Sequence, residues 1–263
     1  MRLSQFDVWS AGDFSALAAS SIIVGELLCE SIPLRAGQRV LDVATGSGNT
    51  AMSAARRACD VVGVDFVPAL LERARERVHA ERLRNITFEA GDTQALPFPD
   101  AAFDVVLSTF GHMFAPDPDQ AAKEMARVTK PGGTVAFIAW TADGMFSKVF
   151  ALHDKYNPAG PGLAKCCAWG DEGFIREKFG PYAKSFRIRR QDRVFRARSA
   201  EQWLGFMRQN LGPTLLTFGG LDQEGQEAFS LEMIGTMKPY NQSGDETLFV
   251  VTDYTEAVIT TVA

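Results

Sequence analysis

The sequence predicts an α/β protein built on a doubly wound, mostly parallel sheet. Five short apolar runs, rich in β-branched residues, recur between residues 38 and 140. The runs are continuous rather than alternating, which is typical of strands buried on both faces. Segments with helical spacing separate them, and strands that alternate with helices form parallel sheets with right-handed crossovers.

The apolar runs are the expected strands, and they cover residues 38–43, 60–64, 85–89, 103–108 and 134–140. Two helices are expected between them, over residues 68–82 and 119–129. The first has Pro68 at an opening helical position, followed by apolar residues at helical spacing. The second stops before a Pro-Gly-Gly turn at 131–133.

The segments outside this core are expected to be mostly helical. Residues 13–30 read as one helix, with an apolar stripe through Leu17, Ile22, Ile23, Leu27 and Leu28. After residue 140 we expect a strand pair at 185–197, helices near 199–209 and 224–238, and a strand at 254–262. The sequence contains no internal repeat and no low-complexity linker that would mark a domain boundary.

The charge balance argues against a nucleic-acid partner. Lys and Arg number 27 against 32 Asp and Glu, so the formal net charge is -5, a poor match for a phosphate backbone. Six arginines form one basic cluster, which we interpret as the solvent face of a strand pair rather than a binding patch. They are Arg187, Arg189, Arg190, Arg193, Arg196 and Arg198.

The four cysteines and three histidines predict neither a disulfide framework nor a metal site. No C-x-x-C spacing occurs among the cysteines. The first residues lack a signal-peptide pattern, and the longest apolar run is far short of a membrane span. We therefore expect a cytoplasmic protein without a membrane partner.

The first strand ends in a Gly-rich turn, Asp-Val-Ala-Thr-Gly-Ser-Gly at 42–48. Glycine lacks a Cβ atom and tolerates positive φ, so a ligand can approach the backbone here. The helix that follows offers free N–H groups at its N-terminus. The turn at Gly46 and Gly48 fits a dinucleotide fingerprint as well as other nucleoside binders. A tight strand-to-helix turn without a ligand is the alternative.

The second strand ends at Asp65, 17 residues after Gly48. In a doubly wound sheet, an acid at this strand tip lies beside the Gly-rich turn and can accept two hydrogen bonds from a ribose diol. The spacing suits NAD or another adenosyl ligand, and Phe66 is placed to pack on a purine. Alternatively, Asp65 caps the following helix or is a plain surface acid.

The third strand ends in Gly91-Asp92-Thr93. An acid at this tip can accept the exocyclic amine of adenine, which would identify the base while Asp65 holds the sugar. An Asx-type turn is the alternative, because Gly-Asp-Thr also forms one.

These motifs, taken in order, resemble those of class I S-adenosylmethionine-dependent methyltransferases. They read Val-Leu-Asp-Val-Ala-Thr-Gly-Ser-Gly at 40–48, Val-Val-Gly-Val-Asp at 61–65, Gly-Asp-Thr-Gln-Ala-Leu-Pro-Phe at 91–98, Phe-Asp-Val-Val at 103–106 and Glu-x-x-Arg-Val-x-Lys-Pro-Gly-Gly at 124–133. The resemblance covers residues 38–140. It looks closest to the branch that includes the ubiquinone and menaquinone biosynthesis methyltransferases.

The resemblance implies a Rossmann-like, seven-stranded sheet whose last two strands lie in the C-terminal part, with added helices. Residues 1–140 would form the cofactor-binding core with an N-terminal helical lid. Residues 141–263 would supply the remaining strands and substrate-capping helices. The implied cofactor is S-adenosylmethionine, and the partner is a small molecule bound by a monomer or homodimer.

The resemblance also implies roles for individual residues. Asp42 would neighbour the cofactor's amino group, with Thr45, Gly46 and Gly48 offering close backbone. Asp65 would take the ribose hydroxyls, and Asp92 with Thr93, after Gly91, the adenine. Ser108 would form the wall beside the sulfonium, and Trp9 or Phe14 would lie over the cofactor as a lid.

Methyl transfer asks for alignment and exclusion of water more than for side-chain chemistry. His112 lies just after the fourth strand and has an ordinary pKa near working pH, so it is the candidate base. A satisfied polar residue in the loop is the alternative for His112. An Asn-Pro-Pro-Tyr motif is absent, and aromatic residues are dense after residue 140. We expect transfer to an O, N or C atom of a small, planar or apolar metabolite, of the kind made in secondary metabolism.

Two other functions stay open. A relative that binds the cofactor without methylating would have the same cofactor contacts. An NAD-dependent oxidoreductase would use the same Gly-rich turn. Against the oxidoreductase, Asp42 precedes the first glycine by four residues, and no Tyr-x-x-x-Lys set for hydride transfer is present.

Overall fold

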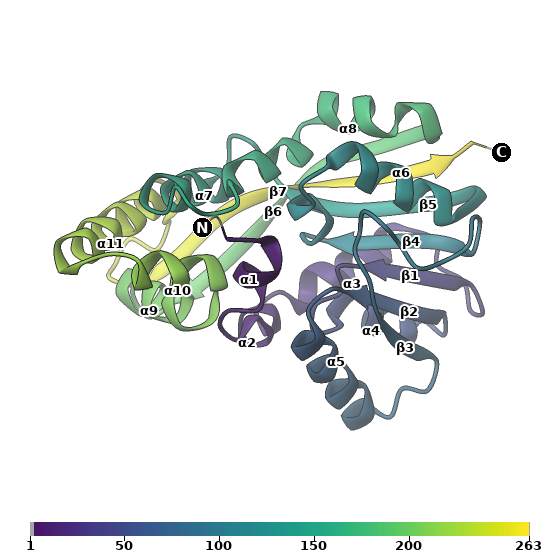
Figure 1. The fold of residues 1–263 in the computed structure, drawn as a ribbon, viewed down its shortest axis with the longest axis horizontal. Helices are drawn as coiled ribbons and strands as arrows, with labels where there is room; N and C mark the ends of the chain where they lie inside the picture. The colour runs from purple at the N-terminus through teal and green to yellow at the C-terminus, as the bar shows by residue number, and fades with distance from the viewer. Residues whose placement is uncertain (1–2, 263) are drawn as a thin grey trace.

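The computed structural model describes residues 3–262, through which one seven-stranded sheet runs (Figure 1). The spatial order is β3-β2-β1-β4-β5-β7-β6. β1 to β5 pair in parallel, while β7 pairs antiparallel with both β5 and β6. The strands are β1 (Arg39–Val43), β2 (Asp60–Asp65), β3 (Ile86–Ala90), β4 (Phe103–Thr109), β5 (Thr129–Trp140), β6 (Ala183–Ala197) and β7 (Leu248–Thr261). The expected mostly parallel sheet is confirmed.

Helices link the parallel strands as the sequence predicts. α4 (Asn49–Arg56) joins β1 to β2, α5 (Pro68–Glu81) joins β2 to β3, and α6 (Pro118–Val128) joins β4 to β5. α6 begins where the Asp117 side chain accepts a hydrogen bond from the Gln120 backbone N–H at 3.0 Å, an N-cap. β5 starts five residues earlier than expected, so the Pro-Gly-Gly segment lies inside the strand.

The N-terminal segment differs from the expected single helix. It forms α1 (Gln5–Trp9), α2 (Phe14–Ala19) and α3 (Ile22–Ser31), with a break at Ser20 and Ser21. The expected apolar stripe is confirmed at Leu28 but wrong at Ile22, Ile23 and Leu27, which are exposed. The buried face of α3 is instead Val24, Gly25, Leu28 and Cys29. A Cβ atom at Gly25 would lie 2.9 Å from Thr50 Oγ1, so this glycine brings α3 against α4.

The C-terminal part adds helices around the far end of β6 and β7 (Figure 1). Residues 185–197 form one long strand rather than a strand pair, and the partner is β7, 50 residues later. The helices at this end are α7 (Met145–Tyr156), α9 (Ala200–Asn210), α10 (Gly212–Gly219) and α11 (Gln223–Met237), whereas α8 (Glu172–Phe179) lies beside α6. The described residues also form the 3₁₀ helices η1 (His112–Phe114), η2 (Leu163–Gly170), η3 (Gly180–Tyr182) and η4 (Lys238–Tyr240).

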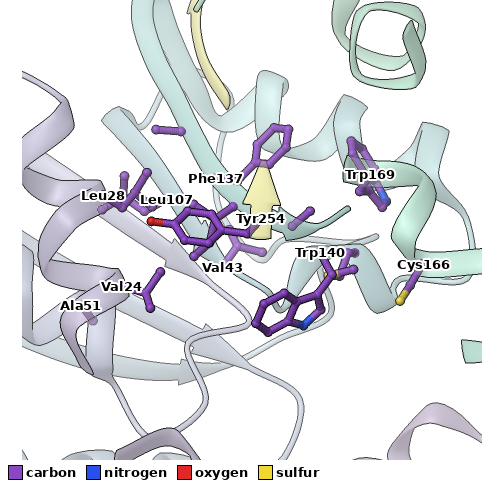
Figure 2. Packing of buried hydrophobic residues seen from close by; sticks show 14 of the residues in the cluster. Val24, Leu28, Val43, Ala51, Leu107, Phe137, Trp140, Cys166, Trp169 and Tyr254 are labelled. Atoms are coloured by element: carbon purple, nitrogen blue, oxygen red, sulfur yellow. The ribbon is translucent and has the colours of Figure 1, made fainter. Parts of the chain in front are cut away.

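One hydrophobic cluster joins the two parts of the chain. Figure 2 shows part of it, including Leu28 of α3, Phe137 of β5 and Trp169 of η2. α1 and α2 lie between the parallel strands and the C-terminal helices, where α1 contacts α10 and α2 contacts α9 (Figure 1). These contacts place the N-terminal helices over the carboxyl ends of the parallel strands. No helix within residues 3–262 is long and apolar enough to cross a membrane.

Candidate active site

A cavity of about 160 Å³ lies at the carboxyl ends of β1, β2, β4 and β5. Its polar end is formed by the tips of β1 and β2, with the turn that follows β1. Its other end is formed by aromatic and aliphatic side chains from α7, β6 and α9. The N-terminal helices contribute Trp9, Phe14, Leu17 and the Ser20-Ser21 break.

Asp42, at the end of β1, is 1% exposed and lines the cavity. Its Oδ2 atom accepts hydrogen bonds from Thr45 Oγ1 at 2.6 Å and from the Ala51 backbone N–H at 3.0 Å. Oδ1 accepts none from residues 3–262, so it keeps free lone pairs. Burial raises the pKa of Asp42 to about 7, and the bonds from Thr45 and Ala51 oppose the rise.

The Gly-rich turn contributes Ala44, Thr45, Gly46 and Ser47 to the cavity lining. Gly46 has φ 55° and Gly48 has φ 86°, conformations that favour glycine. Of these two glycines, Gly46 lines the cavity and Gly48 does not. A Cβ atom at Gly48 would lie 3.2 Å from the Ala74 and Phe88 side chains, so Gly48 serves close packing at the start of α4.

Asp65, at the end of β2, lines the cavity beside Gly46. Its Oδ2 accepts the Gly46 N–H at 2.8 Å, and its Oδ1 accepts the Val67 N–H at 2.9 Å. Burial raises the pKa of Asp65, and these backbone donors oppose the rise. A carboxylate offers about four lone-pair positions, so each oxygen can accept one further donor from a ligand.

The tip of β3 lies outside the cavity lining. Asp92 is exposed, and its Oδ1 accepts the Gln94 backbone N–H at 2.8 Å, which forms an Asx-type turn. Thr93 is buried, and neither it nor Gly91 reaches the cavity surface. A Cβ atom at Gly91 would lie 2.7 Å from Val64 Cγ2, so this glycine is required by packing. The adenine role of Asp92 and Thr93 stays a prediction.

Ser108 and His112 lie behind the cavity wall rather than in it. The Ser108 hydroxyl donates to the Val43 carbonyl at 2.8 Å and accepts the His112 backbone N–H at 3.1 Å. The His112 ring is fully buried between Phe137 and Trp169, with centroid distances of 4.4 and 4.8 Å. Neither ring nitrogen has a hydrogen-bond partner in the part of the chain described. Burial lowers the pKa of His112 to about 3, so the ring is neutral at working pH.

The segment after β4 reaches the cavity through other residues. Thr109, Phe110 and Gly111 line it, and Phe110 has φ 59°, which turns the chain at this point. A Cβ atom at Gly111 would lie 2.4 Å from Ala44 Cβ, so only glycine allows this approach to the β1 turn. The sequence reasoning missed these residues, although their place at a strand tip is the signal that identified Asp65.

Trp9 and Phe66 both line the cavity, and their contact with a bound nucleoside stays a prediction. Trp9 packs on Phe114 at a centroid distance of 4.4 Å and edge-on to Phe14 at 5.7 Å. Its Nε1 donates to Gln5 Oε1 at 2.9 Å within α1. α1 thus holds this ring over the strand tips.

Three rings from separate elements stack along the apolar end of the cavity. Phe110 lies 3.9 Å from Trp140 at an interplanar angle of 12°, and Trp140 lies 4.0 Å from Phe146 at 20°. Phe150 and Phe195 extend this wall. The density of aromatics after residue 140 signalled such a chamber, but the sequence did not point to Phe110 or Phe195.

The cavity residues fit a nucleoside that carries a charged amino-acid tail. Asp42 and Asp65 keep unused acceptor positions, which suit ammonium and hydroxyl donors. At Gly46, a Cβ atom would meet nothing nearer than the Phe14 ring at 3.9 Å, so the backbone lies open to the cavity. Within residues 3–262, no group of three His, Cys, Asp or Glu side chains is placed to hold a metal ion.

Known proteins similar to this chain include methyltransferases. Residues 40–133 match the family model described as a methyltransferase domain. The chain is 33% identical over 228 residues to uncharacterized protein Rv1405c of Mycobacterium tuberculosis, covering 86% of this chain and 83% of that protein. It is 44% identical over 123 residues to demethylmenaquinone methyltransferase of Deinococcus radiodurans, covering 45% of this chain and 51% of that enzyme.

The fold also matches a solved structure. The YcgJ protein from Bacillus subtilis aligns with a TM-score of 0.62 and 19% identity, over 90% of this chain and 97% of that one. This chain therefore belongs to the class I S-adenosylmethionine-dependent methyltransferases, and S-adenosylmethionine is its cofactor.

Proposed function

We propose that this methyltransferase transfers a methyl group to an O, N or C atom of a small, planar or apolar metabolite. The stacked rings of Phe110, Trp140 and Phe146 carry this proposal. A planar acceptor gains most beside such a wall, because offset stacking adds about 0.5–1.5 kcal/mol per ring pair beyond the burial of area.

The polar end of the cavity would hold the cofactor. Asp65 would accept the two ribose hydroxyls, and the free Oδ1 of Asp42 would face the amino group of the methionine tail. Gly46 would allow close approach of the backbone, beside Thr45. Phe66 would pack on the purine, with Asp92 and Thr93 at its edge. When bound, S-adenosylmethionine supplies a methyl group already activated on a sulfonium.

The chain's own contribution to the reaction would be positioning and exclusion of water. Alignment of two bound reactants is worth about 7–11 kcal/mol at best, so the absence of a general base in the cavity does not argue against the reaction. Trp9 and Phe114 would close the cavity above the strand tips. His112 would keep this wall in shape from behind rather than remove a proton, because it does not reach the cavity.

The relatives inform the cofactor end of the site more than the acceptor end. The match to the demethylmenaquinone methyltransferase covers 45% of this chain, which supports the cofactor half and says less about the rest. We assign cofactor binding to residues 1–140 and acceptor capping to residues 141–263. A cytoplasmic location, a role in secondary metabolism, and a monomeric or homodimeric state remain predictions.

Calorimetric titration with S-adenosylhomocysteine, with NAD in parallel, tests the cofactor end of the site. We expect tight binding of the former and none of the latter. Screening planar and non-planar acceptors with methyl-labelled S-adenosylmethionine then tests the acceptor class. Transfer to non-planar polar acceptors alone would contradict the proposal. Binding of the cofactor without any transfer would favour a relative that does not methylate.

A further inference from the structure

Arg193 departs from the other arginines of its cluster. Arg187 pairs with Glu256 at 3.0 Å, and Arg190 pairs with Asp143 and Asp253. Arg193 makes no ion pair with any residue from 3 to 262, although it is only 5% exposed. The interpretation of this cluster as a solvent face is therefore wrong at Arg193. A buried charge without a counter-ion is costly, so its presence calls for an explanation.

The contacts of Arg193 place its guanidinium directly behind the cavity wall. Its Nη2 donates to the Ser20 carbonyl at 3.1 Å and to Ser21 Oγ at 2.7 Å. Its Cζ lies 4.4 Å from the centroid of Phe195 and 5.9 Å from that of Trp140. All four of these neighbours line the cavity. Arg193 does not itself line the cavity, so an acceptor would reach the guanidinium by inserting its ring between Trp140 and Phe195, whose centroids lie 6.2 Å apart.

Two buried polar atoms at this position lack a partner in the described chain. One is Nη1 of Arg193, and the other is Oγ1 of Thr252. Thr252 is the cross-strand neighbour of Arg193 in the β6–β7 register. Thr252 is 3% exposed, so both residues are more than nine-tenths buried. Tyr254, two residues along the same face of β7, packs edge-on to Phe110 at 5.9 Å and continues this polar strip toward the ring stack.

We infer that Arg193, assisted by Thr252, recognises an anionic oxygen on the methyl acceptor, so that the substrate class is an aromatic acid or phenolate. The inference rests on the proposed function and narrows it. A guanidinium presents a planar fork of N–H donors that suits a carboxylate, and Nη1 is the donor left free. The rings of Trp140 and Phe195 would flank the acceptor's own ring. The break between α2 and α3 would then serve to orient the guanidinium, since the Ser20 carbonyl and the Ser21 hydroxyl accept hydrogen bonds from its Nη2 atom.

A pair of probes that differ only in charge tests this inference. Naphthoate and naphthamide have the same planar ring, and their binding is measured by calorimetry on the full chain, with and without saturating S-adenosylhomocysteine. Wild-type protein should bind naphthoate at least about tenfold more tightly, the effect of one hydrogen bond to a charged group. Equal affinities, or no binding of either probe, would overturn the inference.

Variants separate recognition from folding. Arg193→Met keeps the aliphatic stem and should remove the preference by weakening naphthoate binding alone. Arg193→Lys keeps the charge and should retain part of the preference for naphthoate over naphthamide. Arg196→Met removes an exposed arginine of the same strand that packs on Phe249, and should behave like wild type. A preference that survives in Arg193→Met would refute the assignment.

The cofactor also carries a carboxylate, so its binding is measured on the same variants. S-adenosylhomocysteine affinity should stay within about twofold in Arg193→Met. A tenfold loss would mean that the guanidinium holds the cofactor tail, which overturns the acceptor assignment. If methyl transfer to neutral planar acceptors is observed without any naphthoate preference, the proposed function stands and this inference falls. Failure of S-adenosylhomocysteine to bind removes the proposed function instead.

Discussion

Replacing Asp65 with alanine should weaken cofactor binding and destabilise the fold, and the structure separates the two effects. The carboxylate accepts the Gly46 and Val67 backbone N–H groups, at 2.8 and 2.9 Å. Asp65→Ala leaves both buried donors without a partner, at about 1–3 kcal/mol each. The free energy of unfolding should therefore fall by about 2–6 kcal/mol, a large share of the roughly 5–15 kcal/mol of a typical domain.

The loss in binding follows from the acceptor positions that remain free on Asp65. A hydrogen bond to a charged group contributes about 1.5–3 kcal/mol, so the dissociation constant of S-adenosylhomocysteine should rise about 10- to 150-fold. Asp65→Asn keeps one acceptor oxygen and one backbone bond, so it should lose less stability than Asp65→Ala. Asp60→Ala, at the exposed opposite end of β2, is the matched control and should change neither quantity.

Urea titration gives the stability of each variant, and calorimetry gives the dissociation constant under conditions where the variants are folded. Both readouts should change for Asp65→Ala, and each tests a separate role of the carboxylate. A folded Asp65→Ala variant with unchanged affinity for S-adenosylhomocysteine would refute the ribose assignment. Unchanged stability would refute the view that this carboxylate holds the Gly-rich turn in place.

Three further variants test residues in the cavity and behind its wall. Asp42→Asn should abolish the proton release expected when S-adenosylmethionine binds near pH 7, because the cofactor's ammonium favours the charged form of a carboxyl whose pKa burial raises to about 7. Calorimetry in buffers of different ionisation enthalpy measures this proton release. Undiminished release in Asp42→Asn would contradict the contact between Asp42 and the cofactor's ammonium group. His112→Phe should leave turnover within about twofold, whereas loss of a general base costs about 10²–10⁴. Since burial lowers the pKa of His112 from 6.5 to about 3, the wild type loses stability as pH falls below 6.5, and urea titrations should show a smaller loss in this variant. Trp140→Leu removes the middle ring of the stack with Phe110 and Phe146 and should raise KM for a planar acceptor about 2- to 13-fold, the effect of one lost ring contact with the acceptor. An equal loss of S-adenosylhomocysteine affinity would show that Trp140 serves the cofactor instead.

The parallel core was predictable because its signals are local. Each central strand is a continuous apolar run, and β1 is buried at four of its five residues. The position of Asp65 beside the Gly-rich turn followed from a general property of doubly wound sheets, where carboxyl ends of neighbouring strands meet. These features depend on residues close in sequence and on one topological rule.

The expectation for His112 shows where such reasoning stops. Its place just after β4 made it the histidine nearest to the presumed reaction centre. The conformation of Phe110, with φ 59°, turns the chain so that Phe110 faces the cavity and His112 packs behind it. A left-handed conformation at a phenylalanine is uncommon and carries no composition signal. The close approach of Gly111 to Ala44 supports this turn, and that contact spans 67 residues.

The burial of Arg193 could not be predicted from the residues near it in sequence. In sequence it is one of six arginines between 187 and 198. Arg189 is exposed although strand periodicity puts it on the same face as Arg193, so the spacing alone does not single out the buried arginine. Its burial depends on pairing with Thr252 of β7 and on the Ser20-Ser21 break, more than 170 residues before it. The unexpected helix break at Ser20 and Ser21 and the unexpected burial of Arg193 thus belong to the same contact. A single continuous helix over residues 13–30 would hydrogen-bond the Ser20 carbonyl within itself, and Arg193 would lose the acceptor that fixes its guanidinium beside the aromatic chamber.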